Sequence, residues 1–192
     1  VLKLSDGAIT INRNRPNQFT MEDWSRAMMA TAIVKPGRTV ASAMPEIAPE
    51  VPFACTKTLC VAWNSEGVVV AHAASEDAAR EACAVASLIV IDDATAGSPC
   101  GAGGPAIVTK RDLARYGAAA VTFRDTGDGF RPSITYSIGV PYRPWHAERA
   151  YSREARGLPP YQRRQRPDDG RKQPHRGSRP REQNMPQADT AQ

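Results

Sequence analysis

The sequence predicts a sheet domain of the α/β to α+β class followed by a basic tail. Short apolar, partly β-branched runs alternate with short helical patterns, hairpin signals are mixed among them, and the last part of the chain changes composition. Such an order of elements argues against a helix bundle or a β-sandwich. The predicted divisions are a hairpin and short helix (1–34), a proline-rich loop (35–52), a cysteine-containing α/β core (53–146) and a disordered tail (147–192).

The first division is predicted to hold a strand, a turn and a second strand within residues 1–11. A short helix follows, with Thr20 as its N-cap and its end at about Ala30. Its buried face is predicted to carry Trp24, Ala27 and Met28. Residues 35–52 contain four prolines and a glycine, which predicts a loop without regular elements.

The core begins with a predicted hairpin of residues 59–63 and 68–73. Ser75 is a suitable N-cap for a helix over residues 76–87. The buried stripe of that helix consists of Ala79, Ala82, Cys83 and Ala86. Residues 88–91 are all apolar, which predicts a central strand covered on both faces.

The second half of the core is predicted to start with a strand at residues 106–108. Thr109 and Asp112 fit a capping box for a short helix that Gly117 closes. The remaining segments, 118–123 and 130–136, flank the turn-forming residues 125–129 and predict another hairpin.

The basic charge belongs to the tail. Residues 1–146 contain 14 Lys and Arg against 14 Asp and Glu, whereas residues 147–192 contain 11 against 6. The tail has few aliphatic residues and six prolines, so it cannot bury enough apolar surface to offset its ordering entropy. An alternative is an arm that contacts phosphates or anionic lipid heads. Its candidate contacts are Arg163, Arg164, Arg166, Arg171 and Lys172, with Tyr151 and Tyr161 able to stack on bases.

Four cysteines, Cys55, Cys60, Cys83 and Cys100, lie within the core. Structural zinc sites prefer two tight pairs of ligands, a spacing that these residues do not follow. Their even number suits two disulfides with three possible connectivities, and a Cys83–Cys100 bridge would stabilise the fold by about 3 kcal/mol. Buried free thiols and metal or redox chemistry are the alternatives. A structural role is favoured.

Asp92 and Asp93 follow a buried strand, where α/β sheets place ligands and metal-binding carboxylates. His72 lies within an apolar strand, and a satisfied structural histidine is its simpler interpretation. Ordinary turn residues are likewise the simpler interpretation of the two acids. The sequence contains no paired-histidine motif, so a dinuclear hydrolytic centre lacks its ligands. We therefore predict no catalytic residue, metal or other cofactor. The alternative is a Zn²⁺- or Mn²⁺-dependent nuclease or phosphodiesterase that uses these three residues.

No apolar run approaches the length of a membrane span, and no leader peptide is recognisable. The sequence begins at Val1 within a predicted strand, without an initiator methionine. We therefore expect the chain to be the C-terminal piece of a longer protein.

Several short sequence segments, in a fixed order, carry a resemblance to a known family. They are CTKTLCVA at 55–62, EDAAREAC at 76–83, LIVIDD at 88–93, AIVTKRDLARYGAAAV at 106–121, GDGF at 127–130 and RPW at 143–145. Together with PNQF at 16–19, Trp24 and Cys100, they resemble the C-terminal soluble region of ComEC-family competence proteins in their alphaproteobacterial form. The resemblance covers residues 1–146.

The resemblance implies an inner-membrane protein that passes one strand of incoming DNA into the cytoplasm. Its soluble region would be similar to a metallo-β-lactamase fold and would face the periplasm. In other members this region carries a histidine-rich metal motif, which is missing here. The resemblance thus predicts a non-catalytic accessory domain. Its expected partners are DNA, the upstream transmembrane region of the same protein and other competence proteins. An oxidising periplasm also favours disulfides over free thiols.

Overall fold

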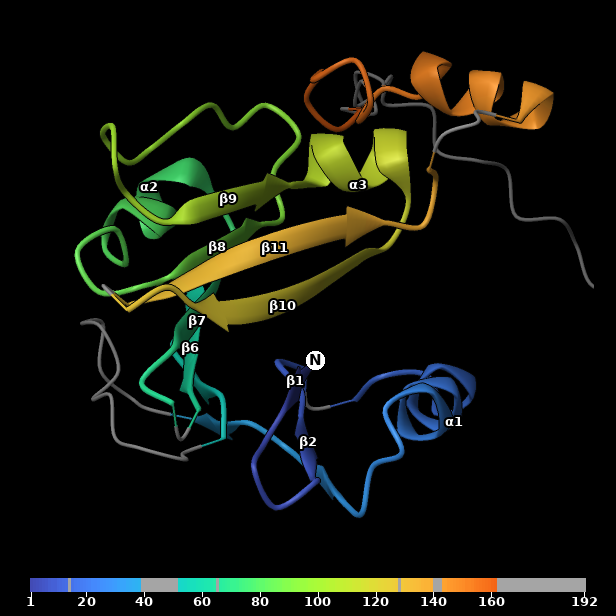
Figure 1. The fold of residues 1–192 in the computed structure, drawn as a ribbon. Helices are drawn as coiled ribbons and strands as arrows, with labels where there is room; N and C mark the ends of the chain where they lie inside the picture. The colour runs from blue at the N-terminus through green and yellow to red at the C-terminus, as the bar shows by residue number, and fades with distance from the viewer. Residues whose placement is uncertain (14, 39–51, 65, 128, 140–142, 162–192) are drawn as a thin grey trace, which may run out of the picture. The chain divides into compact units, whose positions relative to one another are not determined.

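The computed structural model describes residues 1–13, 15–38, 52–64, 66–127, 129–139 and 143–161. Residues Val1–Pro160 form one compact unit (Figure 1). Its largest sheet has six strands in the order β4-β5-β6-β7-β8-β9. These strands are β4 (Gly37–Arg38), β5 (Ala54–Cys55), β6 (Leu59–Trp63), β7 (Val69–Ala73), β8 (Leu88–Ile91) and β9 (Ala106–Thr109).

The six-stranded sheet is mixed. Strands β5, β6 and β7 are antiparallel neighbours, whereas β7, β8 and β9 run parallel to one another. A parallel pair needs a crossover connection, and helix α2 (Glu76–Arg80) lies in the one between β7 and β8. The predicted hairpin of β6 and β7 is confirmed, as is the central position of β8.

Both faces of this sheet are covered. On one face Ala71, Ile89 and Ile91 pack with Ala79 of α2 in one apolar cluster. On the other face the cluster includes Val70, Leu88 and Val108, and a second hairpin packs against it. That hairpin consists of β10 (Ala119–Asp125) and β11 (Phe130–Tyr136), which Figure 1 shows in front of β8 and β9, with α2 on the far side.

A small sheet of β1 (Leu2–Lys3), β2 (Ile9–Thr10) and β3 (Ile33–Val34) precedes the large one. The first two strands form the predicted antiparallel pair, and β3 adds a parallel strand that the sequence did not predict. With three sheets and few helices, the described residues have the mixed content of the α+β class.

Helix α1 (Gln18–Ala27) begins earlier than predicted. Asn17, and not Thr20, is its N-cap, because the Asn17 side chain accepts a hydrogen bond of 2.9 Å from the Phe19 N–H. No residue of the helix is buried, so the predicted buried face is also wrong: Trp24 is half-buried and Ala27 is exposed.

Helix α2 starts at the predicted N-cap, since the Ser75 hydroxyl accepts from the Ala78 N–H at 3.3 Å. Its α-helical part ends at Arg80 and not at residue 87. Beyond it, N–H groups bond to carbonyls three residues back, as from Cys83 to Arg80. Such bonds tighten the end of a helix into turns. Ala79 and Ala82 are nevertheless fully buried, as the predicted stripe required.

Helix α3 (Lys110–Tyr116) has the predicted capping box, with Thr109 and Asp112 bonded reciprocally. Gly117 ends it with a φ of +80°, a backbone conformation that favours glycine. The hairpin after it is in the predicted place. Its strands run to the Asp125–Phe130 pair, so β10 takes in one residue that was predicted to be in the turn.

The start of the predicted tail has regular structure. A 3₁₀ helix, η1 (Pro144–Tyr151), precedes a series of turns, and Ala155 is 0% exposed. The Arg115 Nε donates to the Ala155 carbonyl at 2.6 Å. Polar bonds to the main chain therefore hold a segment that the aliphatic content alone would not. The tail's basic candidates, Arg163, Arg164, Arg166, Arg171 and Lys172, lie outside the described residues, as does most of the predicted proline-rich loop. The described start of that loop contains β4, so the prediction of a segment without regular elements was wrong there, because pairing with β5 makes these two residues a strand.

Candidate functional site: a basic pocket beside a disulfide

The four cysteines form two disulfides, Cys55–Cys60 and Cys83–Cys100. Their Cα atoms are 4.0 and 5.5 Å apart, respectively. Of the three connectivities that the sequence left open, the structure has the one that joins neighbours along the chain. The cysteines are thereby occupied as cross-links, and none of them is a free thiol.

The two disulfides lie on opposite faces of the large sheet. Cys100 belongs to the cluster around α2, with Cys83 packed against it. Cys55 belongs to the cluster under the β10–β11 hairpin, with Cys60 packed against it. Each apolar layer of the domain thus contains one covalent cross-link.

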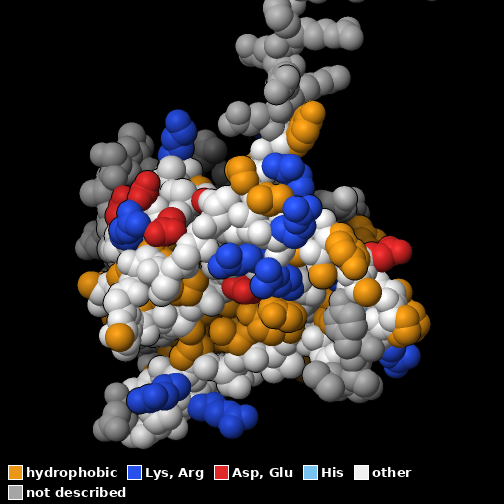
Figure 2. Space-filling view, turned by 90° about the horizontal axis from the view of Figure 1, so that it is seen from above, with side chains coloured by type: hydrophobic (Ala, Val, Ile, Leu, Met, Phe, Trp, Pro, Cys, Tyr) orange, Lys and Arg blue, Asp and Glu red, His pale blue; other side chains and the backbone are white. Residues whose placement is uncertain are grey.

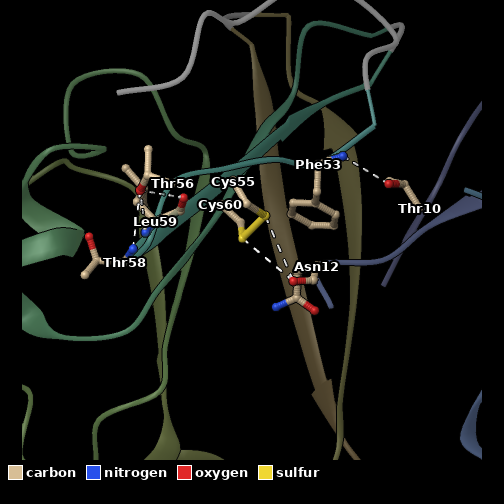
Figure 3. The surroundings of a disulfide bond; sticks show 8 residues. All are labelled: Thr10, Asn12, Phe53, Cys55, Thr56, Thr58, Leu59 and Cys60. Carbon is tan, nitrogen blue, oxygen red and sulfur yellow. Dashed lines mark hydrogen bonds between the residues drawn. A yellow bond between two sulfur atoms is a disulfide. The ribbon is translucent and has the colours of Figure 1, made fainter. Parts of the chain in front are cut away.

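Cys55 and Cys60 are direct partners in the antiparallel pairing of β5 and β6. The intervening turn is fixed by Thr56, whose hydroxyl accepts from the N–H groups of Thr58 and Leu59 at 3.3 and 3.1 Å. The main-chain oxygen of Asn12 lies 4.0 and 3.8 Å from the two sulfur atoms (Figure 3). Because disulfide sulfurs carry no proton, these approaches are packing contacts and not hydrogen bonds. They place the residues after β2 against the disulfide.

A pocket of about 590 Å³ opens at this contact. Arg13, Arg15, Lys57 and His72 line it together with the disulfide. None of the described residues that line it is an Asp or Glu. The arginines come from the segment after β2, the lysine from the β5–β6 turn and the histidine from β7. Three separate parts of the chain therefore supply the positive charge and the imidazole.

His72 is paired with Cys60 across β6 and β7. Burial lowers the pKa of His72, while Asp92 raises it and Arg13 and the Val1 amino group lower it further. The net lowering favours the neutral imidazole, which offers one hydrogen-bond donor and one acceptor. His72 thus contributes polarity to the pocket wall in place of a full charge.

The two acids predicted at the end of β8 have other partners. The Asp92 Oδ1 forms an ion pair with the Lys110 Nζ at 3.0 Å. The Asp93 Oδ1 accepts from the N–H and hydroxyl of Thr95 at 2.8 and 2.7 Å. The second arrangement is a local turn of the kind that the simpler interpretation described.

The three residues of the alternative metal site lie on or after neighbouring strands. Asp92 and Asp93 follow β8, and His72 belongs to β7, which pairs with β8. His72 lines the basic pocket, and Asp92 is close enough to raise its pKa. Within the described ranges, no three His, Cys, Asp or Glu side chains are grouped so that they could hold a metal ion.

Sequence reasoning missed Arg13, Arg15 and Lys57. Each is an isolated basic residue in a part of the chain whose charges balance overall. Only the packing of the Asn12 carbonyl on the β5–β6 disulfide brings them to one pocket. The nearest signal in the sequence was the closely spaced Arg13 and Arg15 in a turn-forming segment.

Comparison of the chain with protein-family models, with curated proteins and with solved structures found no match. None of the helices in the described part of the chain has the length and apolarity needed to cross a membrane.

Proposed function

We propose that this chain is a non-catalytic accessory domain of a membrane DNA-uptake protein of the ComEC type. The parent protein would reside in the bacterial inner membrane, and this domain would face the periplasm. The sequence segments around Cys55, Cys83 and Asp92, which occur in a fixed order, support assignment to this family. Two disulfides suit an oxidising compartment, which supports the periplasmic placement.

The proposal includes descent from a metallo-β-lactamase-like fold. A mixed sheet with apolar layers on both faces is compatible with that origin. In this chain one face is covered by the short helix α2 and the other by the β10–β11 hairpin. A hairpin in such a covering position would be a departure from a sheet covered by helices.

The observation that carries the non-catalytic part of the proposal is the ion pair of Asp92 with Lys110. A carboxylate that ligates a catalytic metal needs an oxygen directed at the ion, with its charge available to it. Here a lysine ammonium lies 3.0 Å from one Asp92 oxygen, and Asp93 bonds its own loop. These contacts give both acids a structural role in the region after β8.

Catalysis can be tested directly on the full chain. Single-stranded and double-stranded DNA would be incubated with the purified protein and Mn²⁺ or Zn²⁺, and metal content would be measured in parallel. We expect neither stoichiometric metal nor cleavage. Cleavage that Asp92→Asn abolishes, while Arg131→Gln leaves it intact, would establish the nuclease alternative and overturn the proposal.

The uptake role needs a test in cells. The segment that encodes this chain would be deleted in frame from the parent gene, and transformation frequency would be measured. We expect a large loss that the wild-type segment and the Asp92→Asn segment restore equally well. Unchanged transformation after deletion would remove the domain from DNA uptake.

A further inference from the structure

Some basic residues of the domain are balanced by carboxylates, and those of the pocket are not. Arg26, Arg80 and Lys110 each pair with a carboxylate. Arg13 and Lys57 form no ion pair or hydrogen bond with another described residue, and the same holds for Arg15. The pocket therefore concentrates positive charge without an acidic partner among the residues that the structure describes.

A second basic surface of the domain is used differently. Figure 2 shows Lys and Arg side chains gathered on the face seen from above. On α3 and η1, Arg115 and Arg149 donate to main-chain carbonyls of Ala155 and Ala114. Those guanidinium groups hold segments of the fold together. The pocket arginines have no such structural duty in the described chain, which leaves their donors available to a ligand.

The pocket is also held in shape before anything binds. The Cys55–Cys60 disulfide closes a short loop with Lys57 near its tip, and Thr56 fixes that turn by hydrogen bonds. The Asn12 carbonyl packs on the same disulfide, which positions Arg13 beside it. A backbone that is already ordered loses little conformational freedom on binding, so the exposed side chains of Arg13 and Lys57 bind an anion more tightly than they would on a free loop.

The pocket is not lined by charge alone. Pro36 and the disulfide supply apolar surface, and Thr58 and His72 supply hydrogen-bonding groups. A volume of about 590 Å³ is within the usual range for small-molecule sites. Cations and apolar surface in the same pocket match a ligand that joins a phosphate to a flat, weakly polar ring. A nucleotide has that chemistry.

We propose that the pocket bounded by Arg13, Lys57 and the Cys55–Cys60 disulfide binds a nucleotide through its phosphate. The nucleotide is either a free nucleoside monophosphate or the phosphorylated end of a single DNA strand, which present the same groups. The site goes beyond the accessory role proposed above, since a purely structural domain needs no ligand. It also stands without the family resemblance, because it rests on the pocket alone.

The test measures binding by isothermal titration calorimetry at low salt, using the oxidised full chain. The ligands are thymidine 5′-monophosphate, a short 5′-phosphorylated oligothymidylate, and thymidine as the ligand without phosphate. We expect at least one phosphorylated ligand to bind and thymidine not to bind. The double variant Arg13→Gln/Lys57→Gln should bind about tenfold more weakly or worse, because charged hydrogen bonds to the phosphate are lost.

Arg131→Gln is the matched control, since Arg131 is an exposed arginine on β11 that does not line the pocket. Its binding should equal that of the wild type. Non-reducing mass spectrometry and thermal unfolding of each variant verify that the disulfides and the fold are intact. A monophosphate that binds alone identifies a free nucleotide, and an oligonucleotide that binds alone identifies a strand end.

Three results would overturn the proposal. The first is that neither phosphorylated ligand binds the wild-type chain. The second is that the double variant binds as well as Arg131→Gln does. The third is that binding is lost in Trp145→Ala, an exposed residue of η1, while the double variant retains it. That last outcome would show that the nucleotide binds at η1 and not in the pocket. None of these results depends on whether the parent protein takes up DNA.

Discussion

The Thr10 hydroxyl accepts a hydrogen bond of 3.0 Å from the main-chain N–H of Phe53. The two residues are 0% and 3% exposed, so water does not compete for this bond. Thr10 lies on β2 of the small sheet, and Phe53 immediately precedes β5 of the large sheet. One side-chain hydroxyl therefore joins the two sheets across 43 residues of sequence.

Replacing Thr10 by Val keeps the shape of the side chain but removes the acceptor. The Phe53 N–H would then be buried without a partner, which costs about 1–3 kcal/mol. Thr10→Ser is the control, because it keeps the hydroxyl and loses only a methyl group. We expect urea unfolding to give a distinctly lower free energy of unfolding for Thr10→Val than for Thr10→Ser. Equal values for the two variants would show that the bond contributes nothing.

Gly117 is predicted to be less replaceable than Gly127, although both have φ near +80°. A Cβ on Gly117 would collide with the Ser137 hydroxyl, which accepts from the Ala118 N–H at 3.0 Å. A Cβ on Gly127 would meet no atom of the described residues within 4 Å. Alanine at either position has a backbone penalty of about 1 kcal/mol. Gly117→Ala should lose a further 1–2 kcal/mol or so with the hydrogen bond. Matching thermal shifts for the two alanine variants would contradict this.

The two disulfides should differ in what their removal costs. Cys83 and Cys100 are 17 residues apart, and Cys55 and Cys60 are 5 apart. In the chain-entropy model the longer loop stabilises by about 3 kcal/mol and the shorter by about 2 kcal/mol. Cys83→Ala/Cys100→Ala should therefore be the less stable of the two paired variants in denaturant unfolding. The reverse order would indicate that native contacts around Cys55–Cys60, and not loop length, set the difference.

The lowered pKa of His72 predicts a loss of stability in mild acid. Its ordinary pKa is 6.5, so below this pH the unfolded chain binds a proton that the folded chain does not. Stability is unaffected by this group above pH 6.5 and decreases as the pH falls from there. The slope is at most about 1.4 kcal/mol per pH unit, until the folded pKa is reached.

His72→Gln removes this contribution, so its free energy of unfolding should decline less steeply between pH 7 and pH 5 than that of the wild type. Denaturant titrations at a series of pH values make the comparison. Arg131→Gln, at an exposed side chain on β11, is the control and should follow the wild-type slope. Parallel curves for His72→Gln and the wild type would mean that burial does not impede protonation of His72.

Local signals in the sequence were sufficient to predict most of the helices and strands of the core. Thr109 and Asp112 form the expected capping box because both halves of that motif are close together in the chain. Strand β8 is buried on both faces, as its uninterrupted apolar run predicted. Strand β3 was missed because two residues carry no periodic signal, and only its pairing with β2 makes it a strand. The start of the tail was misjudged because arginine bonds to carbonyl groups leave no apolar pattern.

The candidate site was harder to predict for the same reason. The residue types of Asp92, Asp93 and His72 suggested a metal site. In the structure, however, Asp92 forms an ion pair with Lys110, and Asp93 accepts a hydrogen bond from Thr95. The number of cysteines predicted pairing, yet only the register of β5 and β6 determines that Cys55 lies opposite Cys60. Arg13 and Lys57 line the same pocket because the Asn12 carbonyl contacts the disulfide, although the two segments are far apart in the sequence.

The placement of one disulfide in each apolar layer has a consequence for how the domain matures. Before oxidation, the layer around α2 and the layer under the β10–β11 hairpin must each be held by packing alone. Oxidation of Cys83–Cys100 would secure the first layer, and oxidation of Cys55–Cys60 would secure the second together with the frame of the basic pocket. A newly made chain therefore acquires the cross-links of its two apolar layers in two separable chemical events.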